Sequence, residues 1–151
     1  MNLATTVMLY CALRAAAREP LVWPGTGPGF TAVKEETDVE YLAAFNVWAA
    51  TTPECRHEYF NILNGDPFTY ERLWPAFAQY FGCKLPDGAP PADPSKHAVN
   101  LEDYYGKSGL AKSIWQQVCD EHPKVDPKSI DSATWWFMQL NLAGSNSPYI
   151  L

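Results

Sequence analysis

The sequence predicts an α+β fold, one mostly helical domain over residues 1–151 with two or three short strands. A chain of 151 residues suits a single domain that buries about 70 % of its unfolded surface. Hydrophobic residues make up 47 % of the chain, which is typical of a globular protein and not of a disordered one. Long stretches without Gly or Pro also alternate with short runs of turn-forming residues, which indicates helices with a few strands between them.

The first expected element is a helix from Leu3 to Ala17, which Pro20 ends. It is apolar on nearly every face, so either it lies at the centre of a core or another element covers its second face. The segment LVWPG at residues 21–25 suits a short strand. The glycine run at residues 25–29 predicts a flexible turn, since Phe30 stands where a dinucleotide-binding loop needs its third glycine.

The middle of the chain predicts a helix, a strand and a turn. Thr37 or Asp38 caps the helix, which runs to about Ala50. The β-rich run His57–Leu63 predicts the strand, and the turn follows it at residues 64–67.

The remainder predicts helices on either side of a proline-rich loop. Thr69 caps a helix that ends near Gly82, and Pro75 either kinks it or begins a second helix. Residues 85–97 predict a surface loop with four prolines. Further helices are expected over Leu101–Tyr105, Lys107–Glu121 and Asp131–Leu142, the last with Gly144 as a stop signal.

Charge and motifs exclude several classes of function. Eleven basic and seventeen acidic side chains leave a net charge of −6, which disfavours nucleic acid as a partner. The chain has no Walker A motif, no Gly-x-Ser-x-Gly motif and no His-Glu-x-x-His pair. Its three histidines, His57, His97 and His122, fall in different elements, so no metal site is expected.

The cysteines and the N-terminal segment favour a cytoplasmic protein. The four cysteines form no Cys-x-x-Cys pair, and we expect four reduced thiols, at least two of them buried in helices: Cys11, Cys55, Cys83 and Cys119. The first twenty residues lack the basic start of a signal peptide, because Arg14 is the first positive side chain. They are also too short and too polar to span a bilayer, so no membrane insertion is expected.

Three stretches carry a resemblance to a known family: MNLATTVMLYCAL, WAATTPECRHEYFNILNGDPFTYERLWPAFAQYFG and ATWWFMQL. They resemble the C-terminal half of the progesterone 5β-reductase and iridoid synthase group of extended short-chain dehydrogenases/reductases. The resemblance runs from Met1 to about Gly144, and its most specific phrase is FNILNGDPFTYERLWP. It implies a substrate-binding domain of the kind that packs beside a dinucleotide-binding Rossmann domain.

The chain departs from this family in the parts that would hold a nucleotide. It has no glycine loop, and Tyr104 and Tyr105 have no lysine four residues on, the spacing that such reductases use. We therefore expect a stand-alone domain without the Rossmann part, with no cofactor, no NADPH binding and no reductase activity of its own.

The resemblance also implies which residues contact the substrate. They lie at the start of the first helix, in the loop before the second and on the last helix: Met1, Thr5, Leu9, Val33, Glu35, Trp136, Phe137, Leu140 and Asn141. Glu35 belongs to an acidic cluster that is mostly a solvated face, and it is the candidate catalytic carboxylate if it faces a pocket.

Three functions remain open at this point. The first is a cofactor-independent enzyme of polyketide or terpenoid metabolism that folds a hydrophobic linear substrate for Diels–Alder or other pericyclic cyclisation, or for isomerisation. The second is a remnant or subunit of an NADPH-dependent enone reductase, and the third is a non-catalytic binding protein for a hydrophobic metabolite. We expect a homodimer, because the helix from Leu3 to Ala17 would otherwise expose its second apolar face.

Overall fold

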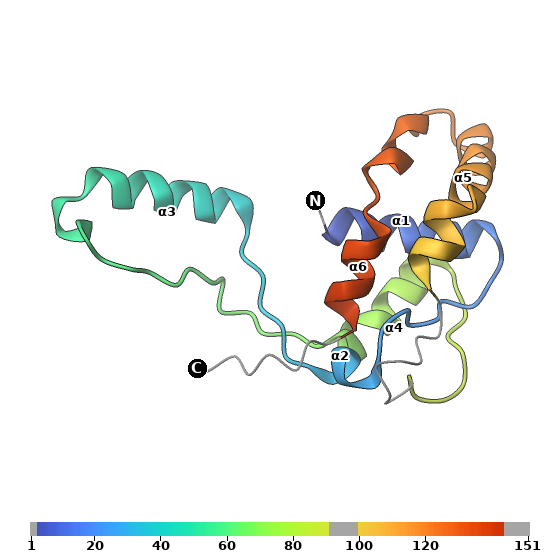
Figure 1. Cartoon of the computed structure of the whole chain (residues 1–151), viewed down its shortest axis with the longest axis horizontal. Helices are drawn as coiled ribbons and strands as arrows, with labels where there is room; N and C mark the ends of the chain where they lie inside the picture. The colour runs from blue at the N-terminus through green and yellow to red at the C-terminus, as the bar shows by residue number, and fades with distance from the viewer. Residues whose placement is uncertain (1–2, 91–99, 144–151) are drawn as a thin grey trace. The chain divides into compact units, whose positions relative to one another are not determined.

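The computed structural model describes residues 3–90 and 100–143, which fall into two compact units (Figure 1). The first unit contains residues 3–32, 70–90 and 100–143, and the second contains residues 33–69. Met1, residues 91–97 and Gly144 lie outside the described residues. The single stand-alone domain expected over residues 1–151 stays a prediction.

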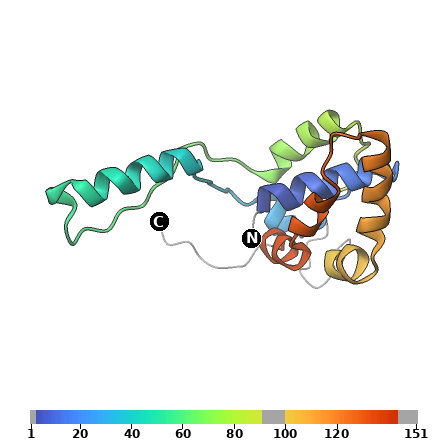
Figure 2. The same cartoon turned by 90° about the horizontal axis from the view of Figure 1, so that it is seen from above.

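Helix α1 (Leu3–Ala16) is the centre of the first unit, as the apolar pattern from Leu3 to Ala17 allows. Three helices pack against it: α4 (Tyr70–Phe81), α5 (Leu110–Glu121) and α6 (Trp135–Leu142) (Figure 2). Tyr10, Cys11 and Leu13 of α1 are fully buried between them. The neighbouring helices cover the second apolar face of α1, so this helix does not offer the dimer surface that the sequence suggested.

The glycine run forms a short helix, α2 (Gly27–Thr31), and the prediction of a flexible turn is wrong. The hydroxyl of Thr26 accepts a hydrogen bond from the backbone N–H of Gly29 at 3.4 Å and caps this helix. The carbonyl of Thr26 also accepts from Nε1 of Trp23 at 2.9 Å. Local side-chain hydrogen bonds therefore order a segment whose composition is typical of a loop.

The helices near the C-terminus begin later than their patterns predict. Gly109, with φ of 73°, precedes α5, so that helix starts at Leu110 and not at Lys107. A π-helical turn, η2 (Glu102–Lys107), comes before it. Asp131 belongs to a 3₁₀ segment, η3 (Pro127–Ser132), and α6 starts only at Trp135.

The described residues contain no strand, so residues 3–90 and 100–143 are all-α and the expected α+β class is wrong. The backbone of residues 21–25 forms single hydrogen bonds with separate partners and does not pair with a neighbouring strand. The N–H of Leu21 donates to the carbonyl of Lys84 at 2.8 Å, and the carbonyl of Leu21 accepts from Nε1 of Trp74 at 3.1 Å. Pro24 has no N–H to donate, which further disfavours a strand here.

The second unit is one helix followed by a returning segment. Helix α3 (Val39–Thr51) begins where the sequence predicts, because Oδ1 of Asp38 accepts from the N–H of Glu40 at 2.9 Å and of Tyr41 at 3.1 Å. A short 3₁₀ turn, η1 (Pro53–Cys55), follows it.

The strand expected over His57–Leu63 is wrong. His57 has φ of 67°, a left-handed conformation that no strand residue adopts. The described pairing in this unit is an isolated antiparallel bridge between Lys34 and Phe68. A β-rich composition does not make a strand where no neighbouring segment supplies a ladder.

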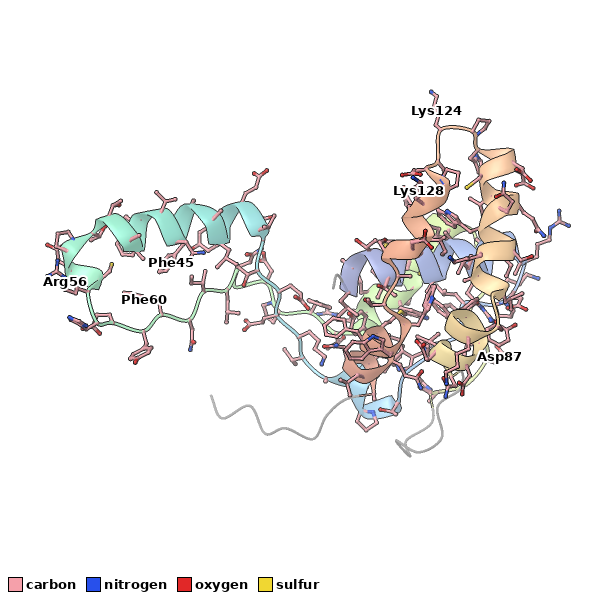
Figure 3. The ribbon with its side chains drawn as sticks, turned by 45° about the horizontal axis from the view of Figure 1, so that its top comes forward. Phe45, Arg56, Phe60, Asp87, Lys124 and Lys128 are labelled. Carbon is pink, nitrogen blue, oxygen red and sulfur yellow. The ribbon has the colours of Figure 1, made fainter. Side chains whose placement is uncertain are left out.

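Aromatic rings join α3 to the returning segment. The ring centroid of Phe60 lies 5.4 Å from that of Phe45 and 6.3 Å from that of Trp48, and Figure 3 shows Phe45 and Phe60 on facing sides. No residue of α3 is buried. The apolar surface of the second unit comprises its large exposed hydrophobic side chains: Val33, Val39, Tyr41, Leu42, Val47, Trp48, Tyr59, Phe60 and Leu63.

Candidate functional site

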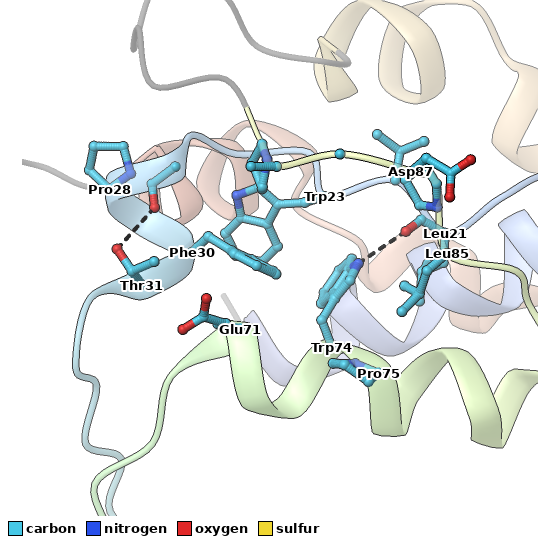
Figure 4. A pocket seen from close by; sticks show the side chains of 16 residues that line it. Leu21, Trp23, Pro28, Phe30, Thr31, Glu71, Trp74, Pro75, Leu85 and Asp87 are labelled. Carbon is cyan, nitrogen blue, oxygen red and sulfur yellow. Dashed lines mark hydrogen bonds between the residues drawn. The ribbon is translucent and has the colours of Figure 1, made fainter.

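A cavity of about 550 Å³ in the first unit has the size and the walls of a small-molecule site (Figure 4). We call it the aromatic pocket. Its lining comes from the segment before α2, α2 itself, the first half of α4 and the loop after α4: Leu21, Val22, Trp23, Gly27, Pro28, Phe30, Thr31, Glu71, Trp74, Pro75, Leu85, Pro86, Asp87, Gly88, Ala89 and Pro90.

Three aromatic rings shape this pocket. The rings of Trp23 and Trp74 are nearly perpendicular at 87°, with centroids 4.9 Å apart, and the ring of Phe30 lies 5.1 Å from that of Trp23. Both indole N–H groups bond to backbone carbonyls, that of Trp23 to Thr26 and that of Trp74 to Leu21. These bonds fix both indole rings and satisfy their polar edges, and the rings, 3 % and 2 % exposed, form the base of the pocket.

Hydrogen bonds from buried polar side chains of α1 hold the segment before α2, which forms one wall of the pocket, in place. The hydroxyl of Tyr10 donates to the carbonyl of Val22 at 2.7 Å, and Nε of Arg14 donates to the carbonyl of Pro20 at 2.9 Å. Arg14 also forms an ion pair with Glu19 at 2.6 Å. Burial raises the pKa of Tyr10, so its hydroxyl stays protonated at neutral pH and acts as a structural donor.

The polar side chains of the described lining are few. The hydroxyl of Thr31 donates to the carbonyl of Gly27 at 3.2 Å. Glu71 on α4 and Asp87 in the loop after it carry exposed carboxylates, which lie on opposite sides of Trp74 in Figure 4. The pocket therefore combines an aromatic centre with two acidic groups, and it holds no acid–base pair in mutual contact among these residues.

A second, smaller cavity of about 280 Å³ lies beside η2, η3 and the start of α6. Its lining includes Tyr105, Trp135 and Trp136. An ion pair between Lys112 and Asp131 at 2.8 Å joins α5 to η3 next to it. Its small volume and its more polar lining make it a weaker candidate for an apolar ligand.

Two helices that carry predicted site residues, α1 and α6, lie side by side. Helices α1 and α6 pack against each other, and the N–H of Thr134 donates to the hydroxyl of Thr6 at 3.2 Å. Thr5 is half-buried on α1, whereas Leu9 is 6 % exposed and belongs to the core. A substrate would reach Leu9 only if the core opened.

The four predicted residues of α6 divide between two faces of that helix. Trp136 and Leu140 are 51 % and 62 % exposed, and Trp136 lines the second cavity. Phe137 and Asn141 are half-buried, and the amide of Asn141 donates to the carbonyl of Phe137 at 2.8 Å.

The third predicted group lies in the second unit. Val33 and Glu35 precede α3, and both side chains are exposed. Their place in one substrate site with α1 and α6 stays a prediction, and Met1 lies outside the described residues.

No pattern in the sequence predicts the aromatic pocket. Its walls combine residues 21–31, 71–75 and 85–90, and no periodicity joins segments so far apart. The Thr-Gly-Pro-Gly run was the available signal, because Thr before Gly-Pro suits the N-cap and first turn of a helix.

The four cysteines carry free thiols, and Cys11 and Cys119 are buried in helices as predicted. No three His, Cys, Asp or Glu side chains gather in a metal-binding arrangement within residues 3–90 and 100–143. Over the same residues, no helix has the length and hydropathy needed to cross a membrane.

Nearly the whole chain is similar in sequence to one part of several plant enzymes. The chain is 29 % identical over 144 residues to an (S)-8-oxocitronellyl enol synthase of Camptotheca acuminata, covering 95 % of this chain and 35 % of that protein. It is 32 % identical over 136 residues to the (S)-8-oxocitronellyl enol synthase of Antirrhinum majus, covering 90 % and 33 %.

A 3-oxo-Δ(4,5)-steroid 5β-reductase of Arabidopsis thaliana is 26 % identical over 142 residues, covering 94 % of this chain and 34 % of the reductase. No family model matches the chain. The chain thus spans about a third of the length of the relatives it matches.

Proposed function

Because the chain belongs to the family of the (S)-8-oxocitronellyl enol synthases and 3-oxo-Δ(4,5)-steroid 5β-reductases, we propose that it binds a hydrophobic small molecule and promotes its cyclisation without a cofactor. The family resemblance drawn from the sequence is confirmed. The observation that carries the proposal is the aromatic pocket, which offers a volume of about 550 Å³ and walls of Trp23, Phe30 and Trp74.

Positioning is the catalytic effect that such a pocket supplies. Holding the reacting atoms of a linear polyketide or terpenoid about 3–3.5 Å apart lowers the activation free energy of its cyclisation by several kcal/mol, without any acid or base. A pericyclic ring closure of Diels–Alder type needs the fewest further catalytic groups once the substrate is positioned. Double-bond isomerisation is the variant reaction, and there a carboxylate would move the proton. Glu35 is the candidate that the resemblance implies, and it is not among the lining residues of the aromatic pocket.

The relatives favour a second candidate function. The chain spans about a third of their length, so a subunit or portion of an NADPH-dependent enone reductase is the alternative enzyme. Such a protein would turn over an enone only with NADPH and with the remaining part of the enzyme present. A protein that binds the ligand and turns nothing over would instead be a carrier.

We expect Phe30→Ala to lower the turnover of a linear conjugated precursor, without added nucleotide, by at least about tenfold, because a displaced wall loosens the reactive conformer. Phe81→Ala is the matched control, since Phe81 is also half-buried, also contacts one other aromatic ring and does not line the pocket. The rates are measured beside thermal unfolding of each variant.

Equal losses from Phe30→Ala and Phe81→Ala would remove the aromatic pocket from the mechanism. Phe137→Ala in the same assay tests the site between α1 and α6 that the resemblance implies. Glu35→Gln separates the two chemistries: cyclisation by positioning changes little, whereas isomerisation by proton transfer falls by roughly 10²–10⁴-fold. Turnover that needs NADPH would support the second candidate function.

The homodimer also belongs to this proposal, with the apolar surface of the second unit as its interface. Val47 and Tyr59 on that surface are 65 % and 99 % exposed, and large apolar patches are rare on monomers. Light scattering is expected to give twice the chain mass of 16.9 kDa. Val47→Glu should then give the monomer mass. A monomer at high concentration from the unchanged protein would contradict the dimer.

A further inference from the structure

We propose that the aromatic pocket takes an apolar ligand that carries a cationic nitrogen, an alkylammonium or a quaternary ammonium group. This inference rests on the proposed function, since it names the class of molecule that the same pocket binds. The names of the relatives refer to 8-oxocitronellyl and 3-oxo-steroid compounds, so they do not suggest a cation.

The arrangement of the aromatic rings is the first argument. Trp23 and Trp74 meet at 87° with centroids 4.9 Å apart, and Phe30 is inclined at 57° to Trp23. Both indole N–H groups are already bonded to backbone carbonyls. Trp23 and Trp74 are 3 % and 2 % exposed and form the base of the pocket, whereas Phe30 is half-buried. The ring of Phe30 is therefore the one with surface left for a ligand, and the negative face of an aromatic ring attracts an ammonium group.

The charges of the lining are the second argument. Glu71 and Asp87 are its ionisable side chains among the described residues, and both are acidic. The ion pairs of the described part of the chain join other residues: Arg14–Glu19, Lys107–Asp103 and Lys112–Asp131. Among the described residues, neither Glu71 nor Asp87 belongs to an ion pair, and the chain has a net charge of −6.

The hydrogen-bonding groups are the third argument. The side chains of the described lining offer acceptors at Glu71 and Asp87, and the hydroxyl of Thr31 donates to the carbonyl of Gly27. A ligand carboxylate or phosphate would meet two like charges, and a ligand carbonyl would find no free side-chain donor there. A cationic nitrogen can pair with one of the two carboxylates, while the apolar part of the ligand fills a cavity of about 550 Å³.

An isosteric pair of probes tests the inference on the full chain. Phenyltrimethylammonium and tert-butylbenzene have nearly the same shape and differ in the charge. Quenching of tryptophan fluorescence at fixed ionic strength reports binding, because Trp23 and Trp74 form the walls. We expect the ammonium probe to bind at least tenfold more tightly than the neutral one.

The charge-neutral double variant Glu71→Gln/Asp87→Asn is expected to lose that tenfold preference and to keep its affinity for tert-butylbenzene. Glu58→Gln/Glu121→Gln is the control, because it removes two exposed carboxylates outside the pocket lining and causes the same change in net charge. Thermal unfolding of both variants confirms that they fold.

The outcomes separate this inference from the proposed function. Equal affinity of the two probes for the unchanged protein, with both lost in Phe30→Ala, would overturn the cationic class and leave the aromatic pocket as the ligand site. The cationic class would also be overturned if Glu58→Gln/Glu121→Gln lost the preference for the ammonium probe as fully as Glu71→Gln/Asp87→Asn. Binding of neither probe would overturn both the inference and the assignment of this pocket.

Discussion

Gly25→Ala is expected to lower the free energy of unfolding of the first unit by about 3–5 kcal/mol. A Cβ atom at Gly25 would lie 2.1 Å from the carbonyl oxygen of Leu142 and 2.6 Å from its carbonyl carbon. These are backbone atoms at the end of α6, so no side-chain rotation relieves the overlap. The segment before α2 and the end of α6 would have to separate.

That separation breaks two further interactions. The N–H of Thr26 donates to the carbonyl of Leu142 at 3.3 Å, and the hydroxyl of Thr26 donates to the carbonyl of Ala143 at 2.5 Å. Each such bond contributes about 1 kcal/mol to stability. The change would also displace Trp23, whose indole N–H bonds to Thr26, and so open one wall of the aromatic pocket.

Urea unfolding measures the effect, and Gly106→Ala is the matched control. A Cβ at Gly106 would approach the carboxyl group of Glu102 at 2.9–3.0 Å, and that group ends a flexible side chain that can move away. The control should cost less than about 1 kcal/mol. Similar losses from the two variants would show that the contact of Gly25 with α6 does not order the first unit.

The second large effect is a loss of stability in alkali. Burial raises the pKa of the Cys11 thiol from 9.0 to about 12. Below pH 9 the thiol is protonated in both the folded and the unfolded states, so it adds no pH dependence to the free energy of unfolding. As pH rises from 9 towards 12 only the unfolded chain releases the proton, and unfolding becomes more favourable.

The size of this effect follows from linkage. A stability change of 1.36 kcal/mol per pH unit over this range gives a loss of about 4 kcal/mol by pH 12 from Cys11 alone. Burial also raises the pKa of Tyr10 and of Tyr105, so both hydroxyls act in the same direction above pH 10. The same burial keeps Cys11 a thiol at neutral pH, where it is no nucleophile.

Urea unfolding between pH 8 and pH 11.5 checks this expectation. Cys11→Ala should be less stable at pH 8, because it leaves a small cavity, and should show a shallower fall above pH 9. Cys55→Ala, in the second unit and half-buried, is the control and should keep the slope of the unchanged protein. An unchanged slope in Cys11→Ala would show that the thiol does not couple folding to pH.

The sequence by itself determined the family and the two long helices nearest the N-terminus. Leu3–Ala16 forms because an unbroken apolar stretch can be buried on every side. Val39–Thr51 forms because Asp38 caps it. These features depend on neighbouring residues in the chain, and a pattern read along the sequence contains them.

The errors arose where a segment's state depends on its partners. His57–Leu63 has the composition of a strand, but the described part of the chain gives it no ladder, and His57 itself is left-handed. The residues before Trp135 fit a helical pattern, yet the N–H of Thr134 bonds to the hydroxyl of Thr6 on α1, where a continuous helix would use its own backbone.

The tertiary structure alone decided the candidate site. The aromatic pocket exists because Trp23 and Trp74, fifty-one positions apart, are fixed by hydrogen bonds to Thr26 and Leu21 and meet at a right angle. Glu71 and Asp87 belong to its lining only because α4 and the loop after it lie beside those rings. Contacts between distant segments depend on how the helices pack on α1, and local periodicity carries no information about that packing.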